Sequence, residues 1–336
     1  MGRVTLADVA LRAGVSTATV SHVLREDAGG TIRVSAATRE AVRAAAESLQ
    51  YVPSTAGRGL ASGATGRIAI VLPNLYQPYF ARMAEAVILE LESRGWTSTV
   101  RLSHDPGAEL DALMGRSTAD ADAVIVCPRY FDPDHFASAP PPRPVVQIGG
   151  GPTRGIDRVE MGEFEGALAA ARHLLEIGRR RIAYLAEPWL DQERSLRFRA
   201  YRTALEEAGE SVDPRLVVVG ADWDRRESGL EAMVGLIRSG AGIDGVMCVN
   251  DAVAVGALRA AALAGLRVPE DVAVTGFDNT EESEFTGPPL TSVDPGVPEM
   301  ARLAVEMVAD RLAGAVGPAR TLSAPTALVT RASTGV

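Results

Sequence analysis

The first fifty residues carry apolar positions at helical spacing. The apolar positions of the first stretch are Leu6, Val9, Ala10 and Ala13, and this i, i+3, i+4, i+7 pattern predicts a short helix. Gly14 can end that helix with a positive φ, and Ser16 is a good N-cap for a second helix. The second apolar stripe comprises Val20, Val23 and Leu24. The pattern predicts two helices joined by a tight turn, which is either a helix-turn-helix or an ordinary helical hairpin.

A third helix and a linker follow. Ser35 is a candidate N-cap, and the apolar face after it consists of Val42, Ala45, Ala46 and Leu49. We expect this helix to close a small three-helix core, which is marginal by itself. Residues 51–62 are rich in Pro, Ser, Thr and Gly and predict a linker.

From residue 67 onward, short apolar runs alternate with amphipathic stretches. The predicted strands are 67–73, 97–102, 123–127, 145–148, 181–185, 216–219, 245–249 and 272–277. The predicted helices are 80–94, 162–177, 194–208, 226–239 and 252–264. Repeated strand–helix units are typical of doubly wound α/β domains with parallel sheets. The length fits two such halves, which divide near residue 160.

Composition places this chain among ordinary globular proteins. It has 336 residues, of which 46% are hydrophobic and 23% charged. No apolar run approaches the roughly 20 residues that span a bilayer. The helical pattern begins almost at the first residue, so we expect no signal peptide, no membrane partner and a cytoplasmic location. The two cysteines, Cys127 and Cys248, are expected to be reduced packing residues.

The charge is unevenly distributed. The net charge is −9, yet residues 1–62 hold seven arginines against five acidic residues, and the chain has no lysine. A slightly basic head, residues 1–62, on an acidic body, the rest of the chain, is compatible with contact between the head and phosphate groups. It is no strong argument for such contact.

The head resembles the DNA-binding head of the lactose-repressor (LacI/GalR) family. The matching residues are Val4-Thr5, Asp8-Val9-Ala10, Ala13-Gly14-Val15-Ser16 and Thr19-Val20-Ser21. The resemblance implies that the second helix enters the major groove. The DNA-contacting residues that it implies are Thr5, Ser16, Thr17, Ala18, Thr19, Ser21 and His22. His22 replaces the frequent Arg at its position.

The linker resembles the hinge helix of the same family. Tyr51, Pro53, Arg58 and Leu60 match the pattern, in which a leucine at the position of Leu60 wedges into the minor groove. Ser54 stands where Asn is usual, and Gly57 where Ala is usual. We therefore expect the hinge to fold only on operator DNA.

The resemblance continues over the body and implies a periplasmic-binding-protein-like fold of two lobes. The implied domains are residues 1–50 for the helix-turn-helix, 51–62 for the hinge, 63–160 with 293–320 for the N-terminal lobe, and 161–292 with 321–336 for the C-terminal lobe. The chain would cross between the lobes three times. The proline run at 140–144 is expected to be a surface loop.

Candidate ligand-binding residues follow the predicted strands. Ligands of open α/β sheets bind beyond the carboxyl ends of the strands, and the residues there match the effector pocket of LacI-type repressors. The implied effector-binding residues are Tyr76, Tyr79, Phe80, Arg197, Trp223, Asn250 and Asp278. The set suits a sugar, because carboxylate and amide groups bind hydroxyls and a ring face meets the apolar face of a pyranose. A purine stacked on the aromatic residues is the alternative.

Two residues near these positions have further interpretations. Asp251 is favoured as the cap of the helix that follows it. Glu187 stands where the family more often has Gly, and a second carboxylate near the cleft would favour a polyol or a cationic group.

Catalysis finds little support in the sequence. The four histidines share no spacing pattern, and the nucleophile elbow, P-loop and HExxH motifs are absent. The glycines at 149–151 do not form a dinucleotide motif and are interpreted as a loop. We therefore expect no enzyme activity, no cofactor and no metal site.

The pattern predicts a ligand-responsive repressor. We expect it to bind a palindromic operator as a homodimer, with a tetramer as the alternative. Three other interpretations stay open: a purine-sensing regulator, a regulator that senses a protein partner, and a sugar-uptake binding protein or enzyme built on the same body.

Overall fold

The structure of the chain is a computed structural model that describes residues 4–24, 34–51, 64–130, 136, 140–188 and 191–335. Two compact units, Met1–Gly66 and Arg67–Val336, are called here the head and the body, and each is described by itself. In the described ranges, no helix has the length and apolar character needed to cross a membrane.

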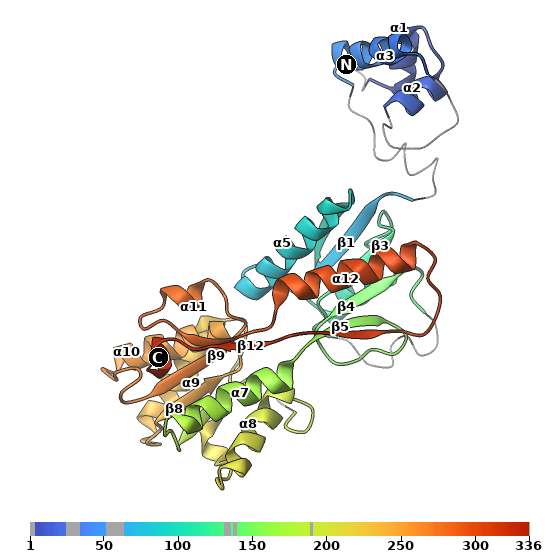
Figure 1. The fold of residues 1–336 in the computed structure, drawn as a ribbon. Coiled ribbons are helices and arrows are strands. Elements are labelled where there is room, and N and C mark those ends of the chain that lie inside the picture. The colour runs from blue at the N-terminus through green and yellow to red at the C-terminus, as the bar shows by residue number, and fades with distance from the viewer. Residues whose placement is uncertain are drawn as a thin grey trace. The chain divides into compact units, whose positions relative to one another are not determined.

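The head contains the three predicted helices, α1 (Leu6–Ala13), α2 (Thr17–Val23) and α3 (Ala36–Ser48) (Figure 1). Gly14 follows α1 with φ 66°, a left-handed conformation that glycine adopts without strain, and so turns the chain into α2. The buried core of the head is Val9, Ala10, Val20, Val23, Val42, Ala45 and Ala46. The predicted helix-turn-helix is therefore confirmed.

The first lobe of the body is a six-stranded parallel sheet in the order β11-β5-β4-β3-β1-β2. Its strands are β1 (Arg67–Leu72), β2 (Thr97–Leu102), β3 (Ala123–Val126), β4 (Val145–Ile148), β5 (Asp157–Met161) and β11 (Thr321–Ala324). Its helices are α5 (Pro78–Ser93), α6 (Pro106–Leu113) and α12 (Val297–Leu312). Helices α5 and α12 lie side by side and bury their apolar faces in one core cluster with the central strands (Figure 1).

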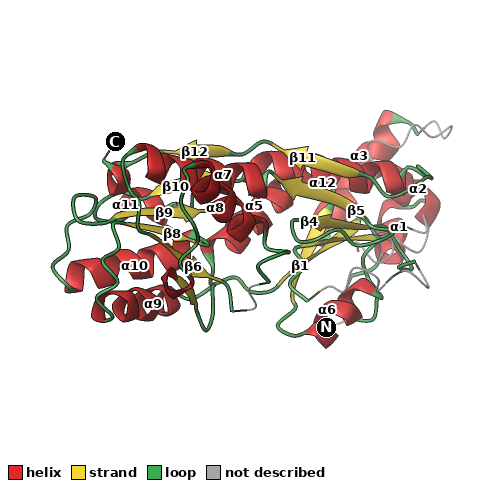
Figure 2. Cartoon of the chain, turned by 90° about the horizontal axis from the view of Figure 1, so that it is seen from below, coloured by secondary structure: helices red, strands yellow, loops and turns green. Residues whose placement is uncertain are grey.

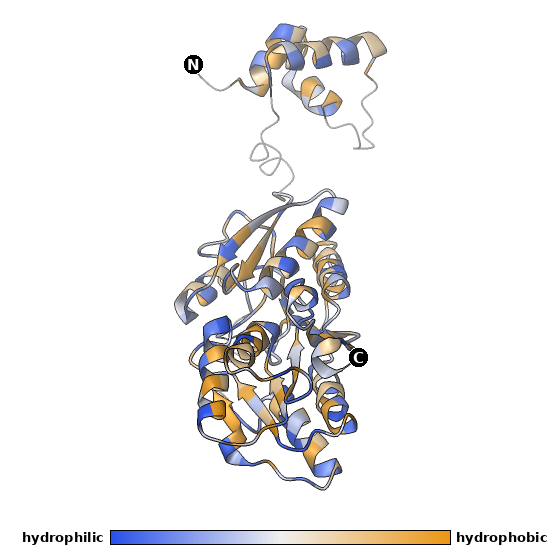
Figure 3. Ribbon diagram, turned by 90° about the vertical axis from the view of Figure 1, so that its left-hand side faces the viewer, coloured by the Kyte–Doolittle hydropathy of each residue, from blue (hydrophilic) through white to orange (hydrophobic). Residues whose placement is uncertain are grey.

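The second lobe is a six-stranded sheet in the order β12-β10-β9-β8-β6-β7, in which only the β10–β12 pair is antiparallel. Its strands are β6 (Ile182–Ala186), β7 (Val217–Val219), β8 (Gly245–Cys248), β9 (Ala273–Phe277), β10 (Thr291–Asp294) and β12 (Ala327–Val329). Its helices are α7 (Glu163–Glu176), α8 (Leu196–Glu207), α9 (Arg226–Arg238), α10 (Asp251–Leu263) and α11 (Glu282–Phe285) (Figure 2). Apolar strands lie between helices whose outer faces are polar (Figure 3), as expected for a parallel sheet covered on both sides.

The chain passes between the lobes three times, as the resemblance implied. The passages follow β5, β10 and β11. At two of them the backbones come so close that a Cβ on Gly296 would lie 2.6 Å from the carbonyl oxygen of Pro325, and Gly296 has φ 73°. A glycine is required at this point, because any side chain would separate the two passages.

Two lobe boundaries differ from those expected. Strand β11 at 321–324 pairs with β5 in the first-lobe sheet, although 321–336 was assigned to the second lobe. Strand β10 extends to Asp294 and pairs in the second-lobe sheet, although 293 was assigned to the first. Short strands that mix Ser and Thr with apolar residues, such as TLSA and TSVD, give a weak periodic signal. The structure therefore moves both boundaries by two to four residues.

The elements that the apolar pattern did not predict include β5, β10, β11 and α6. The strand sequences mix charged or hydroxyl residues with apolar ones, and α6 contains a glycine in its first turn. These elements are held by pairing and packing within the lobe, which a local pattern does not record.

Candidate functional site

Helix α2 presents one polar face in the head. Thr17 and Ala18 are exposed, and Ser21 and His22 are half-buried, whereas Val20 on the opposite face is fully buried. The spacing i, i+1, i+4, i+5 places the four polar-face residues together on one side of a helix. This face is the candidate surface for contact with base edges.

Three further residues expected at the DNA are held in helix caps. Thr5 and Asp8 form a capping box at the start of α1, in which the Thr5 backbone N–H donates to Asp8 Oδ2 over 2.8 Å. Ser16 Oγ accepts from the backbone N–H of Thr19 at 3.1 Å and lies 2.9 Å from Thr19 Oγ1. These hydroxyls fix where each helix begins. Leu60 lies outside the described residues.

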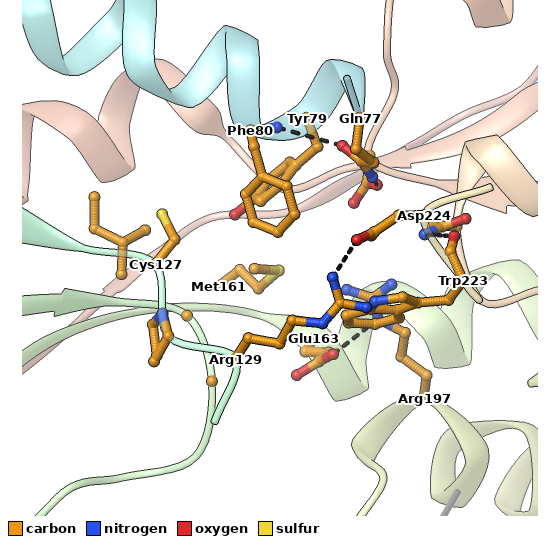
Figure 4. Close-up of a pocket in the computed structure, with 16 residues that line it drawn as sticks. Gln77, Tyr79, Phe80, Cys127, Arg129, Met161, Glu163, Arg197, Trp223 and Asp224 are labelled. Atoms are coloured by element: carbon orange, nitrogen blue, oxygen red, sulfur yellow. Dashed lines mark hydrogen bonds and ion pairs between the residues drawn. The ribbon is translucent and has the colours of Figure 1, made fainter. Parts of the chain in front are cut away.

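A cavity of about 130 Å³ opens between the two lobes of the body. Its walls come from the carboxyl ends of strands in both sheets, where ligands of α/β folds bind. The lining residues are Gln77, Tyr79, Phe80, Cys127, Pro128, Arg129, Ile148, Gly149, Gly150, Met161, Glu163, Arg197, Trp223, Asp224, Asn250 and Asp278 (Figure 4).

Arg197 is held firmly on the second-lobe wall. It lies in the first turn of α8, which follows the N-cap Ser195, and its Nε donates to Glu163 Oε1 over 2.8 Å. Its Nη1 donates to the carbonyl oxygen of Val249, and its guanidinium lies 3.9 Å from the ring centroid of Phe277. The side chain is almost completely buried. Stacking and a charge-assisted hydrogen bond together fix its orientation before any ligand binds.

Asp278 lies at the end of β9 and joins the two lobes. Gln77 of the first lobe donates from Nε2 to Asp278 Oδ2 over 3.2 Å, and Arg82 donates to the carbonyl oxygens of Asp278 and Asn279 at 3.2 and 2.6 Å. Asp278 has φ 106°, which is strained for a residue with a side chain. Burial raises the pKa of Asp278 to about 8, although the charge of Arg197 lowers it.

Asp251 was expected to cap the helix that follows it, but the structure gives this role to Asn250. Asn250, and not Asp251, is the N-cap of α10, because its Oδ1 accepts from the backbone N–H of Val253 at 3.0 Å. Asp251 is buried and accepts hydrogen bonds from Thr280, Ser283 and Ser292. Its carboxylate therefore holds the loop that carries Asp278. The capping preference of Asn and Asp is nearly equal, so burial decided between them.

A second arginine reaches across the cavity. Arg129 follows β3 in the first lobe, and its Nη1 donates to Asp224 Oδ2 in the second lobe (Figure 4). Asn74 of the first lobe donates to the same oxygen over 2.8 Å. Burial raises the pKa of Asp224, while Arg129 lowers it. The pair lies beside Trp223, whose ring centroid is 6.0 Å from the guanidinium of Arg129.

Glu109 holds the loop that carries Arg129. This glutamate of α6 is buried, and its two carboxylate oxygens accept from the backbone N–H groups of Arg129 and Tyr130 at 2.9 and 3.1 Å. Burial raises the pKa of Glu109. The loop after β3 is thus anchored to α6 and presents Arg129 to the opposite lobe.

Six of the seven residues expected at the effector site line the cavity: Tyr79, Phe80, Arg197, Trp223, Asn250 and Asp278. Tyr76 is not among the lining residues. Its side chain is exposed, and the guanidinium of Arg225 lies 4.3 Å from its ring centroid. Glu187 is buried but also does not line the cavity.

The sequence analysis missed several lining residues. The polar ones are Gln77, Arg129, Glu163 and Asp224. Arg129 follows a predicted strand directly, and Asp224 adjoins Trp223, so the rule that sites follow strands could have found both. The loop at Gly149 and Gly150 follows β4 and also lines the cavity, as the same rule suggests.

The cavity combines aromatic faces with fixed charged and amide groups. Tyr79 and Phe80 pack edge to face at a centroid distance of 5.3 Å, and Trp223 lies on the other wall. Small-molecule sites combine these two features, because apolar surface gives burial and polar groups fix orientation. The cavity is small against the roughly 300–1,000 Å³ of pockets for drug-sized ligands.

Two families match the chain. The family described as "Bacterial regulatory proteins, lacI family" matches residues 5–54, and the family described as "Periplasmic binding protein-like domain" matches residues 171–334. The repressor named "HTH-type transcriptional repressor PurR" of Proteus mirabilis is 34% identical over 98% of this chain and 96% of its own length.

Solved structures resemble this chain over both the head and the body. The lac repressor dimer bound to operator and the anti-inducer ONPF is 27% identical, with a TM-score of 0.86 over 99% of each chain. The complex of the transcriptional regulator CelR with cellobiose is 31% identical, with a TM-score of 0.69 over 98% of this chain and 100% of that one. The head, the two-lobed body and the relatives lead to one conclusion. The chain belongs to the LacI family of DNA-binding transcription regulators, with an N-terminal helix-turn-helix head and an effector-binding body.

Proposed function

We propose that the chain is a cytoplasmic repressor that binds a palindromic operator as a homodimer and changes its operator affinity when a monosaccharide binds in the body. The part of this proposal that concerns the effector is supported by one observation, the cavity to which both lobes contribute. A ligand can change DNA affinity only if it binds two lobe arrangements unequally. A ligand that contacts both walls meets this condition.

A monosaccharide suits the cavity for two reasons. The space of about 130 Å³ suits one small ring, and the second-lobe wall offers carboxylate, amide and guanidinium groups that bind hydroxyls. The aromatic rings of Phe80 and Trp223 can meet the apolar C–H face of a pyranose. The solved CelR complex, which carries cellobiose, supports a sugar in this family.

A purine is the second candidate. Relatives named PurR are 31–34% identical to the chain, and three aromatic side chains line the cavity. A purine would stack on one of these rings and use the same polar groups.

A thermal-shift screen separates the two classes. Monosaccharides, amino sugars, nucleosides and purine bases are added to the whole chain, because a ligand that binds only the folded state raises the melting temperature. Quenching of Trp223 fluorescence, in a variant with Trp96 and Trp189 replaced by Phe, then locates binding at the cavity. Stabilisation by purines alone would replace the sugar proposal, and the absence of a shift with all four classes would contradict both.

Selection of binding sites from random DNA tests the head. Two heads of a two-fold dimer read half-sites about one helical turn apart, so we expect a palindromic motif. His22 can make one hydrogen bond to guanine where Arg makes two. His22→Arg should therefore change the preferred base at one symmetric pair of positions. The same motif from both proteins would contradict the assignment of His22 to base reading.

The hinge gives a separate prediction. Leu60→Ala should weaken binding to the selected site more than binding to random DNA, because an apolar wedge acts only on a kinked duplex. Titrations of both DNAs measured by gel shift check this. Equal losses on the two DNAs would remove the minor-groove role of Leu60.

A further inference from the structure

The described residues leave one carboxylate oxygen in the cavity wall without a hydrogen-bond partner. Asp224 is 1% exposed, and its Oδ1 contacts no donor among the residues that the structure describes. Its Oδ2 accepts from Asn74 and Arg129. Buried carboxylate oxygens are nearly always paired in folded proteins. The unpaired oxygen belongs to a residue that lines the cavity, so a molecule bound there could supply the missing donor.

The position of this oxygen is fixed by the opposite lobe. Both donors to Oδ2 come from the first lobe, while Asp224 follows β7 in the second. The backbone N–H of Asp224 donates to Asp222 Oδ1 over 3.0 Å, which holds the main chain as well. Oδ1 therefore cannot turn toward Arg129 without breaking contacts, and it stays available as an acceptor.

The charges around the cavity disfavour an anion. Two of the described lining residues are basic, and each has a carboxylate partner: Arg129 has Asp224, and Arg197 has Glu163. An incoming phosphate or carboxylate would have to displace one of these two carboxylates and would still lie near the other. A neutral or cationic ligand meets no such cost.

We propose that Asp224 is an effector-binding residue that accepts a hydrogen bond at Oδ1 from a hydroxyl or ammonium group. It thereby selects a neutral or cationic monosaccharide over a phosphorylated one. This inference rests on the proposed function. A site built to accept a hydrogen bond discriminates strongly against ligands that leave its buried acceptor unpaired.

Calorimetric titration of the whole chain with matched probes tests the proposal. The probes are glucose, glucosamine and glucose 6-phosphate, together with the same three forms in the galactose and mannose series. Within the series that binds, we expect the phosphorylated probe to bind at least about tenfold more weakly than the neutral or amino form. A phosphorylated probe that binds equally well or better would overturn the proposal without any variant.

Two aspartates near Arg129 provide a matched pair of variants. Asp224→Asn removes the carboxylate at the cavity, and Asp222→Asn removes one that lies 3.8 Å from Arg129 but is partly exposed and does not line the cavity. We expect Asp224→Asn to weaken binding of the best probe about tenfold, because a charge-assisted hydrogen bond is lost. The ratio between the affinities for the unphosphorylated and the phosphorylated probe should also become smaller. Asp222→Asn keeps an Oδ1 that can accept from the backbone N–H of Asp224, so it should change neither value by more than about twofold.

The outcomes separate this inference from the proposed function. If a sugar binds but Asp224→Asn leaves both its affinity and its preference unchanged, the role of Asp224 is wrong and the sugar-responsive body stands. If no probe of any series binds to the wild type, the monosaccharide proposal fails and this inference fails with it. Should Asp224→Asn unfold, the charge series on the wild type still decides.

Discussion

The two walls of the cavity are built from different chemistry. The first-lobe wall consists mostly of apolar and aromatic residues and backbone, such as Tyr79, Phe80 and Ile148. The second-lobe wall carries four of the charged side chains, Glu163, Arg197, Asp224 and Asp278. The first lobe thus offers apolar surface and the second offers fixed polar groups, which is the usual division of roles in a small-molecule site.

The arginines on the two walls show what this difference means. Arg197 pairs with Glu163 inside its own lobe, so its ion pair survives any movement between the lobes. Arg129 pairs with Asp224 of the other lobe, so its ion pair exists only while the lobes are close. The second-lobe wall is organised without the first, whereas the polar part of the first-lobe wall depends on closure. Ligand orientation is therefore expected from one wall, and coupling to lobe movement from contacts between the walls.

The largest expected effect is on the second-lobe wall. Asp278→Ala removes the acceptor of the Gln77 contact and a polar group of the cavity. We expect the effector affinity to fall about a hundredfold or more, since hydrogen bonds to charged or buried groups contribute up to about 3 kcal/mol. Operator binding without effector should stay nearly unchanged, because Asp278 lies in the body. Gel-shift titrations with and without effector measure both.

Asp271→Ala is the control for this substitution. Asp271 belongs to the second lobe but pairs with Arg267 at the surface, away from the cavity. A normal effector response in Asp278→Ala, or loss of operator binding by a folded protein, would show that Asp278 is not an effector residue.

The second-largest expected effect is a change of folding stability with pH. The pKa of Asp278 is about 8 in the folded chain, against an ordinary value of 3.8 that applies to the unfolded chain. Between these two pH values the folded state therefore binds more protons than the unfolded state. Stability should therefore fall as pH rises from about 4 to about 8, by at most about 1.4 kcal/mol per pH unit. The charged groups that face Asp278 are Arg197, Asp251 and Asp224. Thermal unfolding at pH 5 and pH 8 measures the slope.

Asp278→Asn separates this slope from the contribution of neighbouring acids. The pKa of Asp251 is also raised by burial, and that contribution remains in the variant. We expect a flatter dependence of the melting temperature on pH in Asp278→Asn than in the wild type. Identical dependences would show that Asp278 keeps an ordinary pKa.

A smaller effect is expected on the apolar wall. Phe80→Leu keeps most of the buried volume but removes the aromatic face at the cavity. The effector affinity should fall by roughly three- to tenfold, since aromatic contacts contribute about 0.5–1.5 kcal/mol beyond buried area. Calorimetry on Phe285→Leu, a change at an exposed phenylalanine outside the cavity, is the control. If Phe80→Leu lowered the effector affinity as much as Asp278→Ala, the two walls would not contribute differently to binding.

The smallest expected effect belongs to Tyr76. Its ring is exposed and contacts Arg225, and it does not line the cavity. We expect Tyr76→Ala to change the effector affinity by less than about twofold, as is usual for exposed residues. A tenfold loss would return Tyr76 to the site and imply a lobe arrangement in which its ring turns inward.

Much of the fold could be predicted from the sequence where local patterns are strong. The helices of the head and the long strands of both sheets have clear apolar periodicity, and Gly14 and Ser16 mark a turn that depends only on local geometry. Strands β5, β10 and β11 could not be found in this way. Their sequences mix polar with apolar residues, and neighbouring strands hold them in place.

The site shows the same limit. Phe80, Arg197 and Asp278 could be named because the positions after strands are local features that match a known pattern. The pairing of Arg129 with Asp224 joins residues 95 positions apart in two lobes. No periodicity relates such residues, and neither is unusual by itself in the sequence.

The sequence by itself determined the class of the protein: a helix-turn-helix head, an α/β body and the strand ends that line the cavity. Hydrophobic periodicity and capping residues act over a few positions, so the sequence displays them directly. Only the tertiary structure decided which strands share a sheet, which of Asn250 and Asp251 caps α10, and that Asp224 Oδ1 finds no donor in the described part of the chain. These depend on burial and on contacts between distant segments, and a charge or an amide takes its role from the groups that folding places beside it.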